Sequence, residues 1–107
     1  MVGSIYFIDM PYSDFRQFKA RPVLVFKEVD KKDLLILPLT TNLTGEGVII
    51  TKNDIEKGSL KKDSIIIVPK ITAIDTSLIT QNKYIATLKK STFQKVLIEI
   101  CTKFKCS

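Results

Sequence analysis

The sequence of 107 residues contains no histidine and no tryptophan, and only two cysteines. Histidine is the usual side chain for proton transfer near neutral pH, so its absence excludes histidine-pair ribonuclease chemistry, serine triads and Cys-His catalysis. Histidine is also a common ligand of zinc. We therefore expect no metal and no other cofactor, and any catalysis must rely on the stabilisation of charge.

The two cysteines, Cys101 and Cys106, lie near the end of the chain. Their spacing turns them to different faces if the segment is helical, which argues against a disulfide and against a shared metal ion. We expect a buried thiol at Cys101 and a loose one in the tail at Cys106.

Long apolar runs are also absent, although 45% of the residues are hydrophobic. No stretch approaches the roughly 20 apolar residues that cross a bilayer, and the N-terminus lacks the pattern of an export signal. The length suits a single domain, which we place over residues 1–107. We expect a soluble, cytoplasmic protein with no membrane partner.

Arginine is scarce among the basic residues. Lysine and arginine together number 17, but only Arg16 and Arg21 are arginines. Arg21 stands directly before the apolar run 22–26, and its planar guanidinium can hold a phosphate with two parallel hydrogen bonds, which lysine cannot. The net charge of +6 favours an anionic partner, either a nucleic acid or an acidic protein segment.

Short segments rich in β-branched residues predict a mainly β protein. We expect strands at 5–9, 23–29, 34–39, 48–51, 64–68 and 84–88, with the fifth running on past Pro69 to Thr72, and loops at 42–47 and 53–59. Pro38 lacks the N–H of a central strand, which predicts an edge or a bulge there. Asp75 is placed to cap a single helical turn.

The C-terminal segment predicts an amphipathic helix. Ser91 and Gln94 fit a capping box at its start. The apolar residues that follow have the spacing of one helix face, which we expect to close the open end of the sheet; they are Phe93, Val96, Leu97, Ile100, Cys101 and Phe104. Many short strands followed by one helix favour a bent antiparallel sheet, either a sandwich or a small barrel.

Several segments, taken in their order and spacing, resemble the MazF/PemK family, the ribosome-independent messenger-RNA-cutting toxins of toxin-antitoxin pairs. They are 3–11, Arg21-Pro22-Val23, 37–42 with Thr40 and Thr41, 60–67 and 71–75. The resemblance implies the SH3-like small barrel of the MazF/PemK/CcdB toxin superfamily. The chain departs from the family at Ser4, where relatives are usually acidic, and in the loop 13–20. The resemblance therefore does not imply which RNA sequence this protein recognises.

The resemblance also implies an activity and partners. It implies a metal-independent, sequence-selective endoribonuclease that cleaves single-stranded mRNA by attack of a 2′-hydroxyl, leaving a 2′,3′-cyclic phosphate and a 5′-hydroxyl. The matching positions make Arg21 and Thr40 the catalytic residues. Relatives work as homodimers and are neutralised by a cognate antitoxin with an acidic, partly disordered tail.

The loop before Arg21 mixes rings with cations. Phe15 and Phe18 alternate there with Arg16 and Lys19, a mixture in which rings stack on splayed bases while cations follow the phosphates of single-stranded RNA. Asp14, in the same loop, is a candidate proton acceptor if the loop folds over the groove. Thr41 and Ser64 complete the predicted RNA contacts.

Two other functions fit the sequence. The first is a gyrase-poisoning toxin of the same fold, which would depend on its last helix and C-terminal residues and could dispense with the arginine and threonine. The second is a non-catalytic RNA-binding barrel, which would bind RNA with steep salt dependence and leave it intact.

Overall fold

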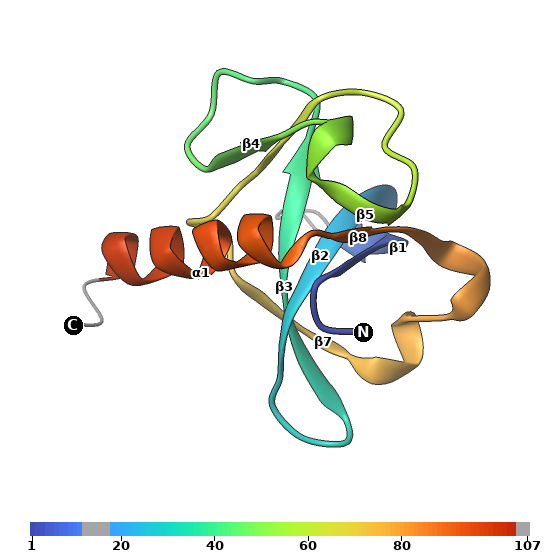
Figure 1. Cartoon of the computed structure of the whole chain (residues 1–107). Helices are drawn as coiled ribbons and strands as arrows, with labels where there is room; N and C mark the ends of the chain where they lie inside the picture. The colour runs from blue at the N-terminus through green and yellow to red at the C-terminus, as the bar shows by residue number, and fades with distance from the viewer. Residues whose placement is uncertain (12–17, 105–107) are drawn as a thin grey trace.

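The computed structural model describes residues 1–11 and 18–104, with side chains described for 1–9 and 20–104. The described residues form strands, three short 3-10 helices and one α-helix (Figure 1). The strands are β1 (Ser4–Pro11), β2 (Phe18–Glu28), β3 (Asp33–Thr40), β4 (Val48–Ile50), β5 (Ile55–Gly58), β6 (Ser64–Ile66), β7 (Thr72–Asp75) and β8 (Tyr84–Leu88). The helices are η1 (Lys52–Asp54), η2 (Thr76–Leu78), η3 (Gln81–Lys83) and α1 (Lys90–Phe104).

The strands form a strongly bent antiparallel sheet in the order β4-β6-β3-β2-β1-β8-β5, with β7 also paired to β3. The long strands β2 and β3 cross the middle of the molecule, and α1 lies over them at its N-terminal end (Figure 1). The mainly β fold with a C-terminal helix, predicted from the sequence, is confirmed. None of the helices in the described part of the chain has the length and apolar character that a bilayer crossing needs.

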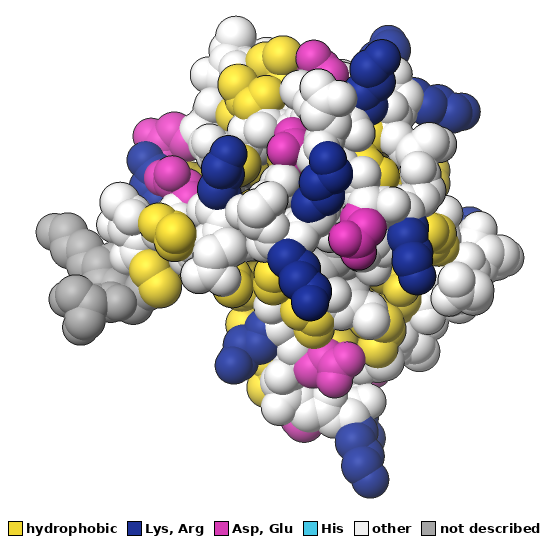
Figure 2. All heavy atoms as spheres, viewed as in Figure 1, with side chains coloured by type: hydrophobic (Ala, Val, Ile, Leu, Met, Phe, Trp, Pro, Cys, Tyr) yellow, Lys and Arg dark blue, Asp and Glu magenta, His cyan; other side chains and the backbone are white. Residues whose placement is uncertain are grey.

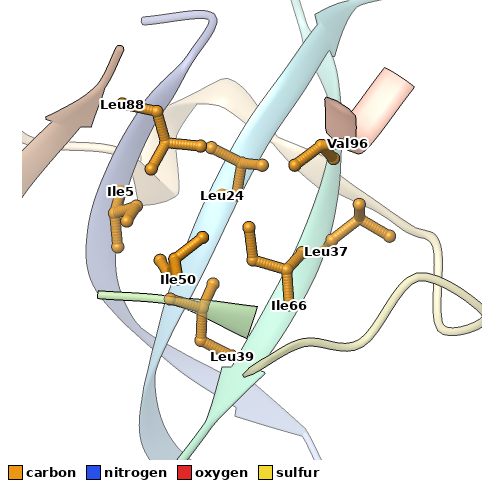
Figure 3. Close-up of a cluster of buried hydrophobic side chains, with 8 residues drawn as sticks. All are labelled: Ile5, Leu24, Leu37, Leu39, Ile50, Ile66, Leu88 and Val96. Atoms are coloured by element: carbon orange, nitrogen blue, oxygen red, sulfur yellow. The ribbon is translucent and has the colours of Figure 1, made fainter. Parts of the chain in front are cut away.

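Two apolar clusters lie on opposite faces of β1, β2 and β3, because successive strand residues point to opposite sides. One cluster contains Ile5, Leu24, Leu37, Leu39, Ile50, Ile66, Leu88 and Val96, which interdigitate between the sheet and the helix (Figure 3). The other contains Tyr6, Ile8, Val23, Val25, Leu34, Ile36 and Ile74. Burial on both faces explains the continuous apolar runs 22–26 in β2 and 34–39 in β3.

Pro38 occupies an interior strand, so its predicted edge position is wrong. Strand β3 pairs with β2 along one side, and with β7 and then β6 along the other. The carbonyl of Pro38 accepts a hydrogen bond of 2.9 Å from the N–H of Ile67. The nitrogen of a strand residue faces the same side as its carbonyl, so the missing N–H falls where β3 changes partner from β7 to β6.

The segment 64–72 is two strands and not the single strand predicted. A turn closed by the hydrogen bond from the Lys70 N–H to the Ile67 carbonyl separates β6 from β7. Both strands nevertheless run alongside β3, β6 beside its end and β7 beside its start. The apolar run through Val68 continues because that side chain is buried in the turn.

The predicted loop 53–59 is also wrong, because β5 pairs there with β8. Only Ile55 of β5 packs against the core, and its other residues are exposed. This strand is defined by its partner and carries almost no apolar pattern of its own. The strand predicted at 48–51, the loop 42–47 and the Asp75 cap are confirmed; the Asp75 carboxylate accepts from the Ser77 N–H at 2.8 Å.

Helix α1 differs from its prediction at both ends. It begins at Lys90, with the Lys89 carbonyl accepting from the Phe93 N–H, so Ser91 lies inside the first turn and the predicted capping box is displaced. Val96 is buried and Phe93 and Ile100 pack against the core. Cys101 and Phe104 are exposed, which corrects the buried thiol expected at Cys101; Cys106 lies outside the described residues. The helix covers the sheet with its first turns only.

Asp54 joins η1 to α1. One carboxylate oxygen accepts from the backbone N–H of Thr51 at 2.8 Å, completing a capping box, and the other accepts from the Thr92 hydroxyl at 2.8 Å. Partial burial would raise the pKa of Asp54, but these hydrogen bonds and the charge of Lys95 outweigh it and hold the pKa below its usual value. The carboxylate therefore stabilises the fold in its ionised form.

We expect Asp54→Ala to lower the free energy of unfolding by about 1–2 kcal/mol at pH 7, as the loss of a helix cap does. Because the pKa of Asp54 is lower in the native state, its carboxylate stabilises the folded protein fully at pH values above the pKa of an unfolded aspartate, about 3.9. This contribution disappears as the pH falls through the native pKa. Denaturant titrations at pH 7 and pH 3 should therefore show a larger difference between wild type and variant at pH 7. An equal difference at both pH values would contradict the assignment. Asp63→Ala, at an exposed loop aspartate, is the control.

Gly58 allows β5 to approach a bulge in β8. The register of β1 and β8 shifts between Ile5 and Tyr6, which leaves Ile85 as an extra residue. Gly58 has a φ of +80°, and a Cβ there would lie 2.2 Å from the Ile85 carbonyl oxygen. A side chain at this position would therefore be strained and would collide with backbone.

We expect Gly58→Ala to lower the free energy of unfolding by about 1–3 kcal/mol, the cost of a side chain held at an unfavourable φ. Gly45→Ala is the matched control, because a Cβ at Gly45 meets nothing within 4 Å; it should change stability by no more than about 0.5 kcal/mol. Thermal or urea unfolding of both variants measures the contrast. Equal stabilities would show that β5 does not need this approach.

Candidate functional site

A groove of about 590 Å³ opens at the end of the sheet where β2 begins and β3 finishes. Its walls come from β1, β2, β8, the residue after β3 and the segment from β5 to β6. The residues that line it are Phe7, Pro22, Thr41, Ser59, Leu60, Lys61, Lys62, Ser64, Tyr84 and Ile85. Two of the residues predicted from the sequence, Thr41 and Ser64, are thus brought together.

Strands β2 and β3 part beside this groove. Their ladder ends at the pair Val23 and Pro38, after which β2 continues beside β1 and β3 beside β6. Arg21 and Thr40 stand two positions beyond that last pair, one on each strand. Because side chains two apart share a face, both lie on the same side of the sheet, just beyond the point where the ladder of β2 and β3 ends.

The catalytic candidates do not line the groove. Successive strand residues point to opposite faces, so Arg21 lies on the face of Ile8 and Val23, whereas Pro22 lies beside Phe7 in the groove wall. Arg21 is half-buried opposite Ile8 of β1. The Thr40 hydroxyl oxygen accepts a hydrogen bond of 3.2 Å from the Asn42 N–H, and it keeps its own proton for donation.

Ser64 is well placed to accept a hydrogen bond from a ligand. Its side chain is only 4% exposed, and its hydroxyl donates to the Lys62 carbonyl at 3.1 Å. With that proton committed, the oxygen is left as an acceptor. Ser64 therefore suits a ribose hydroxyl or a base amino group better than a phosphate oxygen.

The aromatic and basic side chains predicted to contact RNA from the loop before Arg21 lie outside the described part of the structure. Phe15, Arg16 and the candidate proton acceptor Asp14 lie outside the described residues. The backbones of Phe18 and Lys19 belong to β2, paired with Pro11 and Met10, and their side chains are outside the described part. The predicted RNA contacts of this loop stay predictions.

Sequence reasoning missed the aromatic walls of the groove, Phe7 and Tyr84. Phe7 is 42% exposed between the buried Tyr6 and Ile8. A large ring at the outward position of an alternating strand is the signal that could have found it. Tyr84 is the first residue of β8, and no sequence signal distinguishes it from an ordinary strand residue.

Tyr84 is held by a chain of hydroxyl groups. Its hydroxyl bonds to that of Thr87, which bonds in turn to the Ser4 hydroxyl at 2.9 Å. Its ring meets the ring of Tyr6 edge to face, with centroids 5.7 Å apart and an interplanar angle of 76°. Burial, and secondarily the neighbouring Tyr84, raise the pKa of Tyr6, so Tyr6 stays neutral at ordinary pH.

The positive charge of the protein does not mark the site by itself. Lysine and arginine side chains are scattered over the face in Figure 2, with acidic side chains between them. At the groove, however, Lys61 and Lys62 are exposed, and none of the acidic side chains that the structure describes contributes to the lining. In residues 1–11 and 18–104, no three cysteine, aspartate or glutamate side chains are grouped so as to hold a metal ion.

Comparisons with known proteins identify the family and the fold. Residues 1–104 match the family model described as PemK-like, MazF-like toxin of type II toxin-antitoxin system. A search of curated proteins gave no match.

Solved structures that share the fold include two toxins. The Mycobacterium tuberculosis toxin MazF-mt6 has a TM-score of 0.69 at 18% identity, covering 95% of this chain and 96% of its own. An endoribonuclease in complex with its cognate antitoxin, from a mycobacterial species, has a TM-score of 0.69 at 17% identity, covering 98% of this chain and 92% of its own. Because the family model spans nearly the whole sequence, the chain belongs to the PemK-like, MazF-like toxins of type II toxin-antitoxin systems.

Proposed function

We propose that this protein is a sequence-selective endoribonuclease toxin that cleaves single-stranded mRNA in the cytoplasm without a metal. We further propose that it works as a homodimer and is neutralised by a cognate antitoxin whose acidic tail occupies the RNA groove. The family match over residues 1–104 carries the proposal. It is supported by a structural neighbour that is described as an endoribonuclease bound to its antitoxin.

The proposed reaction is an internal transesterification. The 2′-oxygen attacks the adjacent phosphorus and loses its proton, the bond from phosphorus to the 5′-oxygen breaks, and that oxygen gains a proton. The products are a 2′,3′-cyclic phosphate and a 5′-hydroxyl. The protein must stabilise the extra negative charge on the phosphoryl oxygens, since charge stabilisation is usually the largest catalytic contribution.

Arg21 and Thr40 supply that stabilisation. The guanidinium of Arg21 donates two parallel hydrogen bonds to the phosphoryl oxygens and neutralises charge. The Thr40 hydroxyl, oriented by the Asn42 N–H, donates a further bond without adding charge. Their positions on one side of the sheet, just beyond the last pair of β2 and β3, support this division of roles. Arginine is a poor base because of its high pKa, and Asp14 stays the candidate proton acceptor.

Both ligands of the proposed cycle are anionic. The net charge of +6 attracts RNA, and it attracts an acidic antitoxin tail by the same long-range field. An antitoxin tail that covers the groove would therefore compete with RNA directly. Disorder of such a tail before binding suits a segment that must wrap around a groove.

We expect Arg21→Lys and Thr40→Val each to reduce RNA cleavage by about 10²-fold or more, the cost of losing one preorganised donor at a transition-state oxyanion. The lysine keeps the charge and loses the fork, and the valine keeps the shape and loses the hydroxyl. The measurement is cleavage of a long single-stranded RNA in EDTA, with sequencing of the new ends. Wild type should cut at a recurring short motif.

Lys27→Ala and Thr102→Val are the matched controls, because they remove a cation and a hydroxyl from exposed positions outside the groove lining. Both should retain wild-type cleavage. Intact RNA after incubation with folded wild-type protein, over several transcripts, would overturn the endoribonuclease proposal and favour gyrase poisoning or RNA binding alone.

A further inference from the structure

The segment 41–47 leaves the sheet directly after the catalytic candidate Thr40. Thr40 is the last residue of β3, and its pairing with Ile65 is the last pair that joins β3 to β6. Residues 41–46 are all exposed. Because the ladder ends here, the orientation of the Thr40 side chain depends on the local hydrogen bonds that the following residues make.

Two consecutive turns hold the start of this segment. In the first turn, the Thr40 hydroxyl oxygen accepts a hydrogen bond of 3.2 Å from the backbone N–H of Asn42. In the second turn, Oδ1 of Asn42 accepts from the N–H of Thr44 at 3.2 Å and from the Thr44 hydroxyl at 2.7 Å. Threonine and asparagine side chains favour turns through such local bonds. Asn42 belongs to both turns and therefore links the Thr40 hydroxyl to Thr44.

The first turn selects the orientation of the Thr40 hydroxyl. A threonine side chain has three staggered χ1 positions, and the bond to the Asn42 N–H favours the position that brings Oγ1 to that N–H. Because the oxygen accepts, the hydroxyl proton is left for donation. The turn therefore presents a preorganised donor on the face of the sheet that Thr40 shares with Arg21.

The second turn secures the first. A single hydrogen bond at exposed backbone contributes little against competition from water. The Asn42 N–H reaches Thr40 only while the peptide group between residues 41 and 42 keeps its orientation. The Asn42 side chain, held by two donors of Thr44, restricts the backbone directly after that peptide group. Loss of the second turn should therefore loosen the Thr40 hydroxyl.

The far end of the segment is fixed by a different contact. Gly47 has a φ of +150°, and a Cβ there would lie 1.8 Å from the Ile66 carbonyl oxygen, so the chain rejoins the sheet in close packing. Next to it, Glu46 forms an ion pair of 3.6 Å with Lys103 of α1, but both side chains are exposed and such a pair contributes little. The exit of the segment is thus fixed by packing, whereas its entry depends on the two turns.

We infer that Asn42 and Thr44 are positioning residues for the Thr40 hydroxyl, and that they act through the backbone N–H of Asn42 without touching the RNA. The inference rests on the proposed function in so far as Thr40 acts on the phosphoryl oxygens. The fixed orientation of the hydroxyl does not depend on that function. The competing role for the exposed Asn42 amide is a direct contact with RNA, which would change affinity and not the rotamer of Thr40.

The first test measures the Thr40 rotamer in the unliganded protein. Three-bond couplings from the Thr40 methyl carbon to its backbone nitrogen and carbonyl carbon report χ1, and wild type should show a single rotamer. Asn42→Ala and Thr44→Val should shift the couplings toward an average of several rotamers. The alanine should shift them more, because it removes both bonds to Thr44 and the valine removes one. Asn42→Asp and Thr44→Ser keep the accepting oxygen and the hydroxyl, so they should keep the wild-type couplings.

Asn82→Ala is the matched control. Asn82 is an exposed asparagine that also accepts a hydrogen bond from a threonine hydroxyl, that of Thr80, but it lies in η3 and does not line the groove. The variant should leave the Thr40 couplings and RNA cleavage at the wild-type level. Thermal unfolding verifies that each variant is folded.

The second test measures cleavage of single-stranded RNA. Asn42→Ala should lower kcat by about 3- to 10-fold, the fold-change that corresponds to one net hydrogen bond. KM should not change, because the interaction that is lost belongs to the transition state. Thr44→Val should lower kcat less, and Thr44→Ser should restore it. In a Thr40→Val background, Asn42→Ala should cause no further loss, since the hydroxyl that it positions is absent.

The outcomes separate the inference from the proposed function. Averaged Thr40 couplings in wild type would overturn the inference, as would a folded Asn42→Ala variant that keeps a single rotamer or a wild-type kcat. A raised KM, or a further loss in the Thr40→Val background, would also overturn it and assign Asn42 to RNA binding. A wild type whose single Thr40 rotamer is lost in Asn42→Ala, but which leaves RNA intact, would refute the ribonuclease proposal and keep the positioning of the hydroxyl.

Discussion

The register between β2 and β3 is the constraint on which the site depends. The two strands are locked by apolar pairs on both faces up to Val23 and Pro38 and then part. A slip of one residue would exchange the faces of a whole strand and bury the Arg21 or Thr40 position on the wrong side. The core therefore fixes, through backbone hydrogen bonds, that Arg21 and Thr40 lie on the same side of the sheet.

The groove lined by Phe7 and Pro22 is built from irregularities of the sheet. Regular strands would continue the ladder and close this end, whereas here β2 and β3 change partners, β8 is bulged and β5 approaches it through a glycine. Each irregularity exposes or redirects a side chain that regular pairing would cover. Residues that line the groove thus lie where backbone pairing is interrupted, beside regions that are regularly paired.

The strands β2 and β3 could be predicted from the sequence, because burial on both faces requires a run of consecutive apolar residues in each of them. Strand β5 could not, since only Ile55 is packed and the strand is defined by its partner β8. The break after β6 was missed because Val68 is buried within a turn. The family resemblance pointed to Arg21 and Thr40, and the face that they share depends on a register that no local pattern encodes. Phe7 and Tyr84 were missed because their role depends on the groove itself.

The contact between Tyr6 and Tyr84 gives the protein an intrinsic optical probe. The chain has no tryptophan and three tyrosines, so ultraviolet excitation near 280 nm excites tyrosine alone. One ring of this pair is buried, and the other lines the groove. The emission of the unlabelled protein therefore carries a signal from the groove wall, without a dominant indole elsewhere in the chain to mask it.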